Sequence, residues 1–462
     1  MFNLNIHNFR SFQNQDFKFS RINILIGENS GGKSSLLKFL LVLKQTLDSP
    51  TEGNLKLKGD YTDLGNFEEA IYKRKNRSKL KFAFANAEKY HKYFLSEYEE
   101  YEYDLNNKHK KQILKFVKNV ENSTTSIAFD LTSKLNNHHA IKTTISNNKI
   151  GYLEIIQRKR NEDDNARELI CDLKIKLNEQ EEFVFENCLG FKHGFFTMIG
   201  IELKDRFIKK YGDKFIPYYY SAFYLLLFQN FTIKNIELIR FVNPIGSSPK
   251  RFYFKEDKKA SYKNIDIEKF INIMGDPAFS KKDYNERITD LNKVIKEFGI
   301  ADEISLVTDQ QLPVVALNVK TKEFWSNITD VGYGVSLQIP ILFQAVLSEK
   351  YTKDGQTLLI EQPEVHLHPT LQSNFIKTLI NLGSKNRYFI ETHSEHIIRK
   401  LQVMVKSDEF KLKPEDVTIH YFKRTPEKFE ITNHYIQTNG RMEPKFPDGF
   451  FDASYNLIKE LL

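Results

Sequence analysis

The clearest hydrophobic pattern lies near the start of the chain, where a short apolar run is followed by a helical repeat. Residues 22–26 read Ile-Asn-Ile-Leu-Ile and predict a buried β-strand. Along residues 34–47, leucines recur with the spacing of one helical face, which predicts an amphipathic helix. A glycine-rich segment, residues 27–34, joins the two and reads Gly-Glu-Asn-Ser-Gly-Gly-Lys-Ser. The pattern therefore predicts a strand, a glycine loop and a helix in direct succession.

A second group of apolar runs occupies the C-terminal part of the chain. Residues 357–361 read Thr-Leu-Leu-Ile-Glu and predict a buried strand that ends in a carboxylate. A helix is predicted over residues 370–382 and a further strand over residues 388–393. Strands that alternate with helices favour a parallel sheet, in which ligands lie at the carboxyl ends of the strands. The predicted fold class is therefore α/β.

The region between these two groups has a different pattern. Residues 123–189 read as short alternating strands typical of hairpins, whereas residues 90–120 and 204–231 are predicted to be helical. We find no phosphate-binding pattern or metal-ligand spacing in this middle region and interpret it as a large α+β insertion. The predicted segments are residues 1–69, the N-terminal part of an α/β head; 70–235, the insertion; 236–423, the C-terminal part of the head; and 424–462, a small C-terminal hairpin and helix.

Composition restricts the class of protein. The chain has 462 residues, which is enough for about two or three domains. Its net charge of +8 is compatible with DNA binding but does not indicate it. Two cysteines exclude a disulfide framework and a cysteine-based zinc site. The most apolar segment, residues 215–231, is short and interrupted by Pro217, and the N-terminus lacks a signal-peptide pattern, so we expect a cytoplasmic protein without a membrane partner.

Residues 27–34 fit the phosphate-loop pattern G-x-x-x-x-G-K-[ST], and the flanking strand and helix are the context that this motif requires. Backbone N–H groups of such a loop and the N-terminus of the next helix attract phosphate oxygens. Lys33 is expected to reach the β- and γ-phosphates, and the Ser34 hydroxyl is expected to ligate Mg²⁺. ATP and Mg²⁺ are therefore the predicted ligands. We expect the phosphate contacts to come from Asn29, Ser30, Gly31, Gly32, Lys33, Ser34 and Ser35.

Polar residues also stand at the ends of the two later strands. Glu361 is expected to bind Mg²⁺ or its water beside the phosphates. His393 ends the next strand and is a candidate catalytic residue. His366 and His368 have no third ligand of the usual kind nearby in the sequence, so a metal site at this pair is disfavoured.

A second turn rich in backbone N–H groups precedes these strands. Residues 330–336 read Asp-Val-Gly-Tyr-Gly-Val-Ser and open an apolar helical run over residues 339–347. A G-x-G-x-S turn at a helix start attracts anions, but the phosphates bound by this chain are already held by residues 27–34. We therefore expect Gly334 and Ser336 to contact the γ-phosphate bound by another copy.

Together these motifs resemble the ABC-type ATPase heads related to RecF, the SMC proteins and the OLD family, usually called AAA family ATPases. The resemblance covers both ends of the chain and omits the insertion. The matching segments are residues 8–12 and 27–34, which resemble the first strand pair and Walker A; 330–336, the signature motif; 358–369, Walker B and the D-loop; and 390–396, the switch-histidine segment.

The resemblance implies a P-loop NTPase head and further roles for particular residues. Gln45 stands where the Q-loop glutamine of that family falls, which implies another Mg²⁺ ligand. The family also implies a homodimer or higher oligomer whose heads hold ATP between them. Residues 446–452 resemble a small C-terminal domain of unknown function in one bacterial branch. Related branches serve in anti-phage defence, beside a separate nuclease or effector chain.

Three positions depart from the family pattern. Leu337 stands where many relatives carry a glutamine, and Gly246 stands where many carry an arginine. Gln362 follows the Walker B acid, a position that is often the catalytic glutamate, and an amide cannot accept a proton. Either Glu364 is the catalytic base, or Gln362 only orients the attacking water and turnover is slow.

The sequence leaves more than one function open. An ATPase would close two heads around ATP to switch a partner or act on DNA, in anti-phage defence or in DNA repair and recombination. A nucleotide-gated scaffold would bind ATP with little hydrolysis, which Gln362 favours. A fused nuclease is disfavoured because no D-x-D strand or histidine–asparagine metal pattern follows His393, and residues 417–462 are too few for such a domain.

Overall fold

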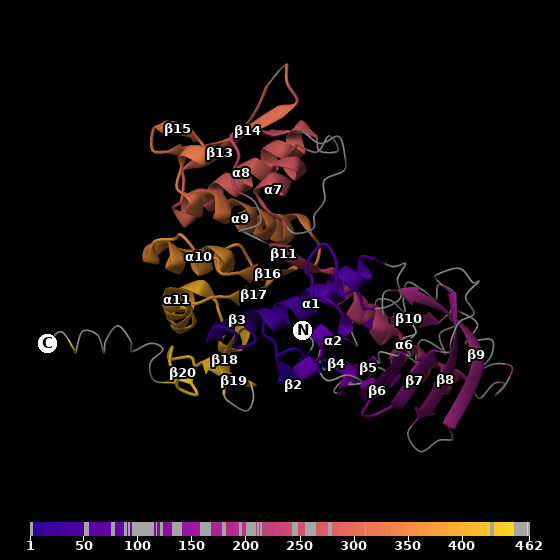
Figure 1. Ribbon diagram of the computed structural model, residues 1–462. Helices are drawn as coiled ribbons and strands as arrows, with labels where there is room; N and C mark the ends of the chain where they lie inside the picture. The colour runs from indigo at the N-terminus through magenta and orange to yellow at the C-terminus, as the bar shows by residue number, and fades with distance from the viewer. Residues whose placement is uncertain are drawn as a thin grey trace. The chain divides into compact units, whose positions relative to one another are not determined.

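In the computed structural model, the chain forms two compact units (Figure 1). One unit contains Met1–Phe19 and Lys38–Glu237, and the other contains Ser20–Leu37 and Leu238–Leu462. The structure describes residues 3–49, 55–74, 79–86, 90, 93–94, 115–116, 118–120, 123–131, 141–157, 168–177, 182–193, 196–199, 209, 212, 215–242, 248–254, 265–275, 280–309, 311–425, 429–447 and 460.

The first unit is built on a nine-stranded antiparallel sheet with the order β10-β9-β8-β7-β6-β5-β4-β1-β2. Every second residue of β5 is buried, as expected for a sheet covered on one face. Helix α6 (Phe215–Glu237) contacts β5, β6, β7 and β8 and covers that face. The strands are β1 (Asn3–Phe9), β2 (Phe12–Phe17), β4 (Leu80–Asn86), β5 (Thr125–Leu131), β6 (Ile141–Asn147), β7 (Gly151–Gln157), β8 (Glu168–Leu177), β9 (Glu182–His193) and β10 (Phe196–Ile199), and the short helices are α2 (Phe67–Ala70) and η1 (Tyr72–Arg74).

The second unit contains a seven-stranded sheet with the order β11-β16-β17-β3-β18-β19-β20. The first five strands run parallel, and the last two add antiparallel pairs. All six residues of β3 are buried, as expected for a central parallel strand of a sheet covered on both faces, and this burial explains the apolar run in the sequence. The strands are β3 (Ile22–Gly27), β11 (Ile239–Val242), β16 (Thr357–Glu361), β17 (Arg387–Glu391), β18 (Val417–Arg424), β19 (Phe429–Ile436) and β20 (Met442–Glu443).

Because these five strands are parallel, their carboxyl ends lie at one edge of the sheet, and helices follow three of them. Helix α1 follows β3, α10 follows β16 and α11 follows β17, and α10 packs against α11. Such an edge is where ligands bind in α/β sheets. The helices are α1 (Lys33–Leu47), α10 (Pro369–Asn381), α11 (Glu395–Lys406), η4 (Asp408–Phe410) and η5 (Pro414–Asp416).

Helix α9 (Tyr333–Tyr351) joins this sheet to a smaller layer of the same unit. It packs against α7 and α8, which lie beside a four-stranded antiparallel sheet. Near its end, Glu349 accepts hydrogen bonds from the backbone N–H groups of Lys385 and Asn386 at 2.9 and 2.8 Å, which holds α9 against the loop before β17. The remaining elements are β12 (Tyr253–Phe254), α7 (Ile267–Met274), α8 (Lys281–Phe298), β13 (Glu303–Thr308), β14 (Val314–Thr321), β15 (Phe324–Asn327) and η3 (Ile328–Asp330).

The predicted α/β head with an α+β insertion is confirmed. Residues 123–189 contain the antiparallel strands β5 to β9, and the described part of the helix predicted over residues 204–231 lies in α6. The helix predicted over residues 90–120 and the final helix of the tail fall mostly outside the described residues.

The boundaries of the two compact units differ from those of the predicted segments. Residues 1–19 and 38–69, which the sequence assigns to the head, group with the insertion, because β1 pairs with β4. The boundary predicted after residue 235 falls next to the division between Glu237 and Leu238. Residues 424–462 group with the head. The four predicted segments themselves stay a prediction.

None of the helices within the described residues is both long enough and apolar enough to cross a membrane.

A buried histidine in β18 gives the fold a testable dependence on pH. His420 is fully buried, its Nδ1 lies 2.8 Å from Asn433 Oδ1, and burial lowers its pKa from 6.5 to about 4. Between these values the unfolded chain binds the proton and the folded chain does not. The contribution of neutral His420 to stability is therefore present above pH 6.5 and is lost as the pH falls through about 4. The difference corresponds to about 3 kcal/mol.

We expect His420→Gln to flatten this part of the pH profile, because glutamine does not titrate. The measurement is the free energy of unfolding in urea at several values between pH 4.5 and pH 7.5, for wild type and variant. His396→Gln, at an exposed position on α11, is the matched control and is expected to follow the wild-type slope. A His420→Gln profile parallel to that of the wild type would contradict the prediction.

Candidate nucleotide-binding and ATPase site

The loop between β3 and α1 lies tightly against the end of β18. The N–H of Glu28 donates to the carbonyl of Phe422 at 3.1 Å. Gly27 has a φ of +139°, and a Cβ at this position would lie 2.0 Å from the Phe422 oxygen. Only glycine fits this conformation and this approach, so the first glycine of the motif is required by the packing of the loop. Asn29 and Ser30 are exposed at its tip, and Ser30 has a φ of +59°.

The side chain of Lys33 folds into this loop. Its Nζ donates to the carbonyl oxygens of Gly27 and Glu28 at 2.9 and 2.8 Å, and the residue is only 4% exposed. Burial lowers the pKa of Lys33, and the carboxylates of Glu391 and Glu28 oppose that shift. An ammonium group enclosed by a glycine loop is the arrangement that receives phosphate oxygens, so these residues fit ATP.

The hydroxyl that the motif assigns to Mg²⁺ is already hydrogen-bonded to a carboxylate. Ser34 Oγ donates to Glu391 Oε1 at 2.9 Å, and Glu391 is a buried residue at the end of β17. Glu391 is not among the residues that the sequence motifs predict for this site. Residues 387–391 form an apolar strand that ends in an acid, as residues 357–361 do, and this repetition is the signal that could have identified it.

Glu361, the acid that the sequence predicts to bind Mg²⁺, lies beside Glu391. The two residues are direct partners in the parallel register of β16 and β17. Immediately after Glu361 the backbone turns sharply: Gln362 has a φ of +44°, and its N–H donates to the carbonyl of Glu391 at 2.7 Å. The structure therefore brings Ser34, Glu361, Gln362 and Glu391 to the same edge of the sheet.

Glu364 and His393 are also brought together. The backbone N–H of His393 donates to Glu364 Oε1 at 2.6 Å. Burial and the charge of Lys33 lower the pKa of the His393 imidazole, while Glu364 opposes the shift. The Glu364 carboxylate is thus held by the backbone of His393, whose imidazole lies close enough to Lys33 for their charges to interact.

The signature turn packs against the segment that follows Glu361. Gly334 has no room for a side chain, because a Cβ would lie 2.6 Å from the His366 carbonyl oxygen. Gln338 is fully buried, and its Nε2 donates to the Pro363 carbonyl at 2.7 Å. Ser336 Oγ donates to the Tyr333 carbonyl at 2.7 Å within the first turn of α9. The start of α9 and residues 363–366 therefore form one packed piece.

The two histidines of this segment have structural contacts. His368 is the N-cap of α10, where its Nδ1 accepts a hydrogen bond from the N–H of Thr370 at 3.4 Å. The ring of His366 lies edge-on to Tyr333, with the centroids 5.3 Å apart. Within the described ranges, no group of three or more His, Cys, Asp or Glu residues is placed to hold a metal ion.

Gln45 belongs to the first unit, and its amide is engaged in a loop. Its Nε2 donates to the Lys56 carbonyl at 2.5 Å, and its Oε1 accepts from the N–H of Thr62 at 3.1 Å. These bonds account for its burial at 2% exposure. A Mg²⁺ contact from Gln45 stays a prediction, and it requires the amide to release this loop.

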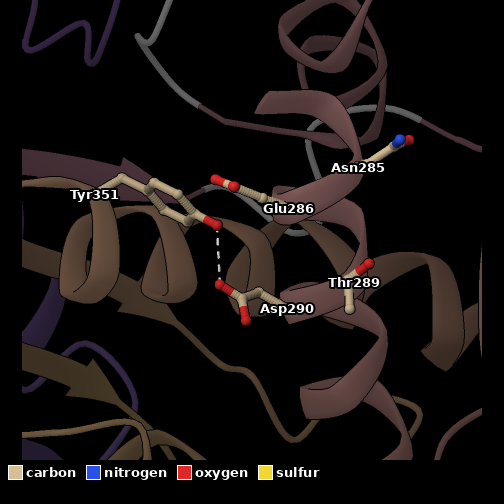
Figure 2. A pocket seen from close by; sticks show the side chains of 5 residues that line it. All are labelled: Asn285, Glu286, Thr289, Asp290 and Tyr351. Atoms are coloured by element: carbon tan, nitrogen blue, oxygen red, sulfur yellow. Dashed lines mark hydrogen bonds between the residues drawn. The ribbon is translucent and has the colours of Figure 1, made fainter. Parts of the chain in front are cut away.

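A surface pocket of about 380 Å³ lies elsewhere in the second unit (Figure 2). The hydroxyl of Tyr351 donates to Asp290 Oδ2 at 2.9 Å across it. Burial, followed by this contact with Asp290, raises the pKa of Tyr351 to about 12. The lining residues are Asn285, Glu286, Thr289, Asp290 and Tyr351, and none of them belongs to the predicted nucleotide site.

Comparison with known proteins agrees with this geometry. Residues 1–398 match the family described as "AAA ATPase domain". Residues 412–461 match a second family, described as "Protein of unknown function (DUF3696)". No curated protein matches the chain.

The solved structures that are similar include SMC heads. The SMC head bound to the C-winged helix domain of ScpA has a TM-score of 0.44 and 10% identity, over 94% of this chain and 97% of that one. The SMC head domain from Thermotoga maritima has a TM-score of 0.36 and 10% identity, over 93% and 97%. These TM-scores are too low for a function to be inferred from the similarity.

The fold assignment rests instead on the strand order and on the loop geometry. The family assignment rests on the match over residues 1–398, which spans well over half of the chain. The chain belongs to the AAA ATPase domain family.

Proposed function

We propose that this chain binds ATP with Mg²⁺ at residues 27–34, hydrolyses it slowly, and uses the nucleotide to pair its heads. The observation that carries the proposal is the closed loop, in which the Lys33 ammonium group is buried and Ser34 is bound to a carboxylate. When bound, ATP supplies the γ-phosphoryl group as the electrophile, and Mg²⁺ neutralises charge on its oxygens.

The residues of the chain then have distinct tasks. Lys33 exchanges two neutral carbonyl partners for charged phosphate oxygens, which makes stronger hydrogen bonds. Glu364 is the candidate base, because the His393 N–H fixes one carboxylate oxygen while the other, Oε2, has no hydrogen-bond partner among the described residues. Gln362 cannot accept a proton and is assigned to orienting the water.

Pairing of heads is supported by the start of α9. Gly332 is the exposed N-cap of this helix and makes no side-chain cap bond. The N–H of Val335 donates to the Gly332 carbonyl at 2.9 Å, so we assign the N–H groups of Tyr333 and Gly334 to an anion. We assign this turn, through Gly334 and Ser336, to the γ-phosphate held by a second copy. ATP then joins two chains as a homodimer.

Gln362 favours a second candidate function. If Glu364 does not act as the base, an amide beside the water gives slow turnover, and the protein is a nucleotide-gated scaffold that holds or releases a partner. For either function we propose a cytoplasmic role in anti-phage defence with a separate effector chain, based on the resemblance of the C-terminal tail. A plaque assay in cells that carry the gene, with Lys33→Ala as the inactive control, tests this role.

Lys33→Ala tests the nucleotide site. We expect ATP hydrolysis to disappear and ATP affinity to fall by about tenfold or more, because the only ammonium group enclosed by the described loop is lost. Phosphate release and binding of a fluorescent ATP analogue are the measurements. Lys296→Ala, at an exposed position on α8, is the matched control. Wild-type turnover by a folded Lys33→Ala protein would exclude residues 27–34 as the site.

Glu364→Gln and Gln362→Ala assign the two roles at the water. We expect Glu364→Gln to bind ATP and to hydrolyse it about 10²–10³ times more slowly, because the amide can still accept the His393 N–H but cannot take a proton. Single-turnover hydrolysis measures this rate. Normal turnover by Glu364→Gln together with an inactive Gln362→Ala would reverse the assignment.

Ser336→Arg tests whether the turn acts between copies. The bulky cation is expected to abolish ATP-dependent association and hydrolysis, while each chain keeps nearly normal ATP affinity. Light scattering with and without ATP measures association. Ser336→Ala is the control, because it removes the hydroxyl without adding bulk and is expected to associate.

Mixing Ser336→Arg with Lys33→Ala gives the decisive measurement. A mixed dimer contains one composite site in which both elements are intact, so partial hydrolysis is expected to return. Loss of ATP binding by Ser336→Arg alone, with no rescue on mixing, would show that the turn serves its own chain.

A further inference from the structure

We propose that Glu391 is a second carboxylate of the Mg²⁺ site, acting with Ser34 and Glu361. This inference rests on the proposed function and extends it, because the sequence motifs assign only Ser34, Gln45 and Glu361 to the ion.

The first observation is the contact with the phosphate loop. Glu391 is 5% exposed, and its Oε1 accepts the hydroxyl of Ser34 at 2.9 Å. Ser34 is the side chain that the phosphate-loop motif assigns to Mg²⁺. The carboxylate of Glu391 is therefore one hydrogen bond away from an expected ligand of the ion.

The second observation is the strand order. β17 lies between β16 and β3, and Glu391 is in register with Leu25 of β3 on one side and with Glu361 of β16 on the other. Register partners on neighbouring parallel strands are about 4.8 Å apart and point to the same face. Glu391 is thus one strand closer to the phosphate loop than Glu361. The two carboxylates lie side by side, so their oxygens can bind the same ion.

The third observation concerns charge. Two neighbouring carboxylates repel each other, and a cation beside them removes that repulsion. Glu391 lies close enough to Lys33 for their charges to interact, so the ammonium group supplies part of that positive charge here. If Lys33 turns to phosphate, the pair of acids needs another cation. Carboxylate and hydroxyl oxygens are the ligands that Mg²⁺ prefers.

Binding of a fluorescent ATP analogue, titrated with Mg²⁺ or with EDTA, tests the inference in the full chain. The variants are Glu391→Gln and Glu361→Gln. The control is Glu303→Gln on β13, which removes a carboxylate that forms a surface ion pair with Lys320. We expect Glu391→Gln to lose about tenfold or more of the tightening that Mg²⁺ causes, with the affinity in EDTA unchanged. The control is expected to behave as the wild type.

Thermal unfolding without nucleotide separates this role from a structural one. A glutamine at residue 391 can still accept the Ser34 hydroxyl and relieves the repulsion with Glu361, so the inference predicts an unchanged or higher melting temperature. A lower melting temperature with equal loss of affinity in Mg²⁺ and EDTA would show a structural role and overturn the inference. Full Mg²⁺ dependence in Glu391→Gln, with loss only in Glu361→Gln, would also overturn it. A wild-type chain that binds no ATP would overturn the proposed function itself.

Discussion

The close approach of the phosphate loop to strand β18 determines the position of the rest of the site. The N–H of Glu28 is bonded to the Phe422 carbonyl, and the missing side chain of Gly27 permits that contact. β18 lies within residues 412–461, the segment that matches a family of unknown function. The C-terminal segment therefore packs against the loop of the proposed nucleotide site, and β3 depends on it for one of its two neighbouring strands.

Local signals made the core of this site predictable. The strand over residues 22–26, the loop and the helix are contiguous in sequence, so hydrophobic period and glycine spacing were enough to identify them. The two later strands ending in Glu361 and near His393 were also visible as apolar runs. The contact between Glu391 and Ser34 was not predicted, because it arises from the strand order that places β17 directly beside β3, and no local pattern indicates that order.

Non-local pairing also explains the other differences. The first strands group with the insertion because β1 joins β4, which is more than 70 residues away in sequence. The amide of Gln45 is held by Lys56 and Thr62, partners that no motif specifies. The small sheet beside α8 contains β12, a strand of two residues that is too short to show a period.

In the segment that resembles the signature motif, the glutamine stands at residue 338, one position later than expected, and its contacts give this position a structural role. Leu337 is buried in the core at the position where the resemblance to ABC-type heads leads us to expect a glutamine, and the next residue, Gln338, donates to the Pro363 carbonyl. Together with the contact between Gly334 and His366, this bond joins the start of α9 to the turn that carries Glu364. Close-packed pieces of this kind move together, because separating them would leave a buried amide without its partner. Under the proposed pairing of heads, a contact made by the signature turn with a second copy would therefore act directly on the segment that holds the candidate base.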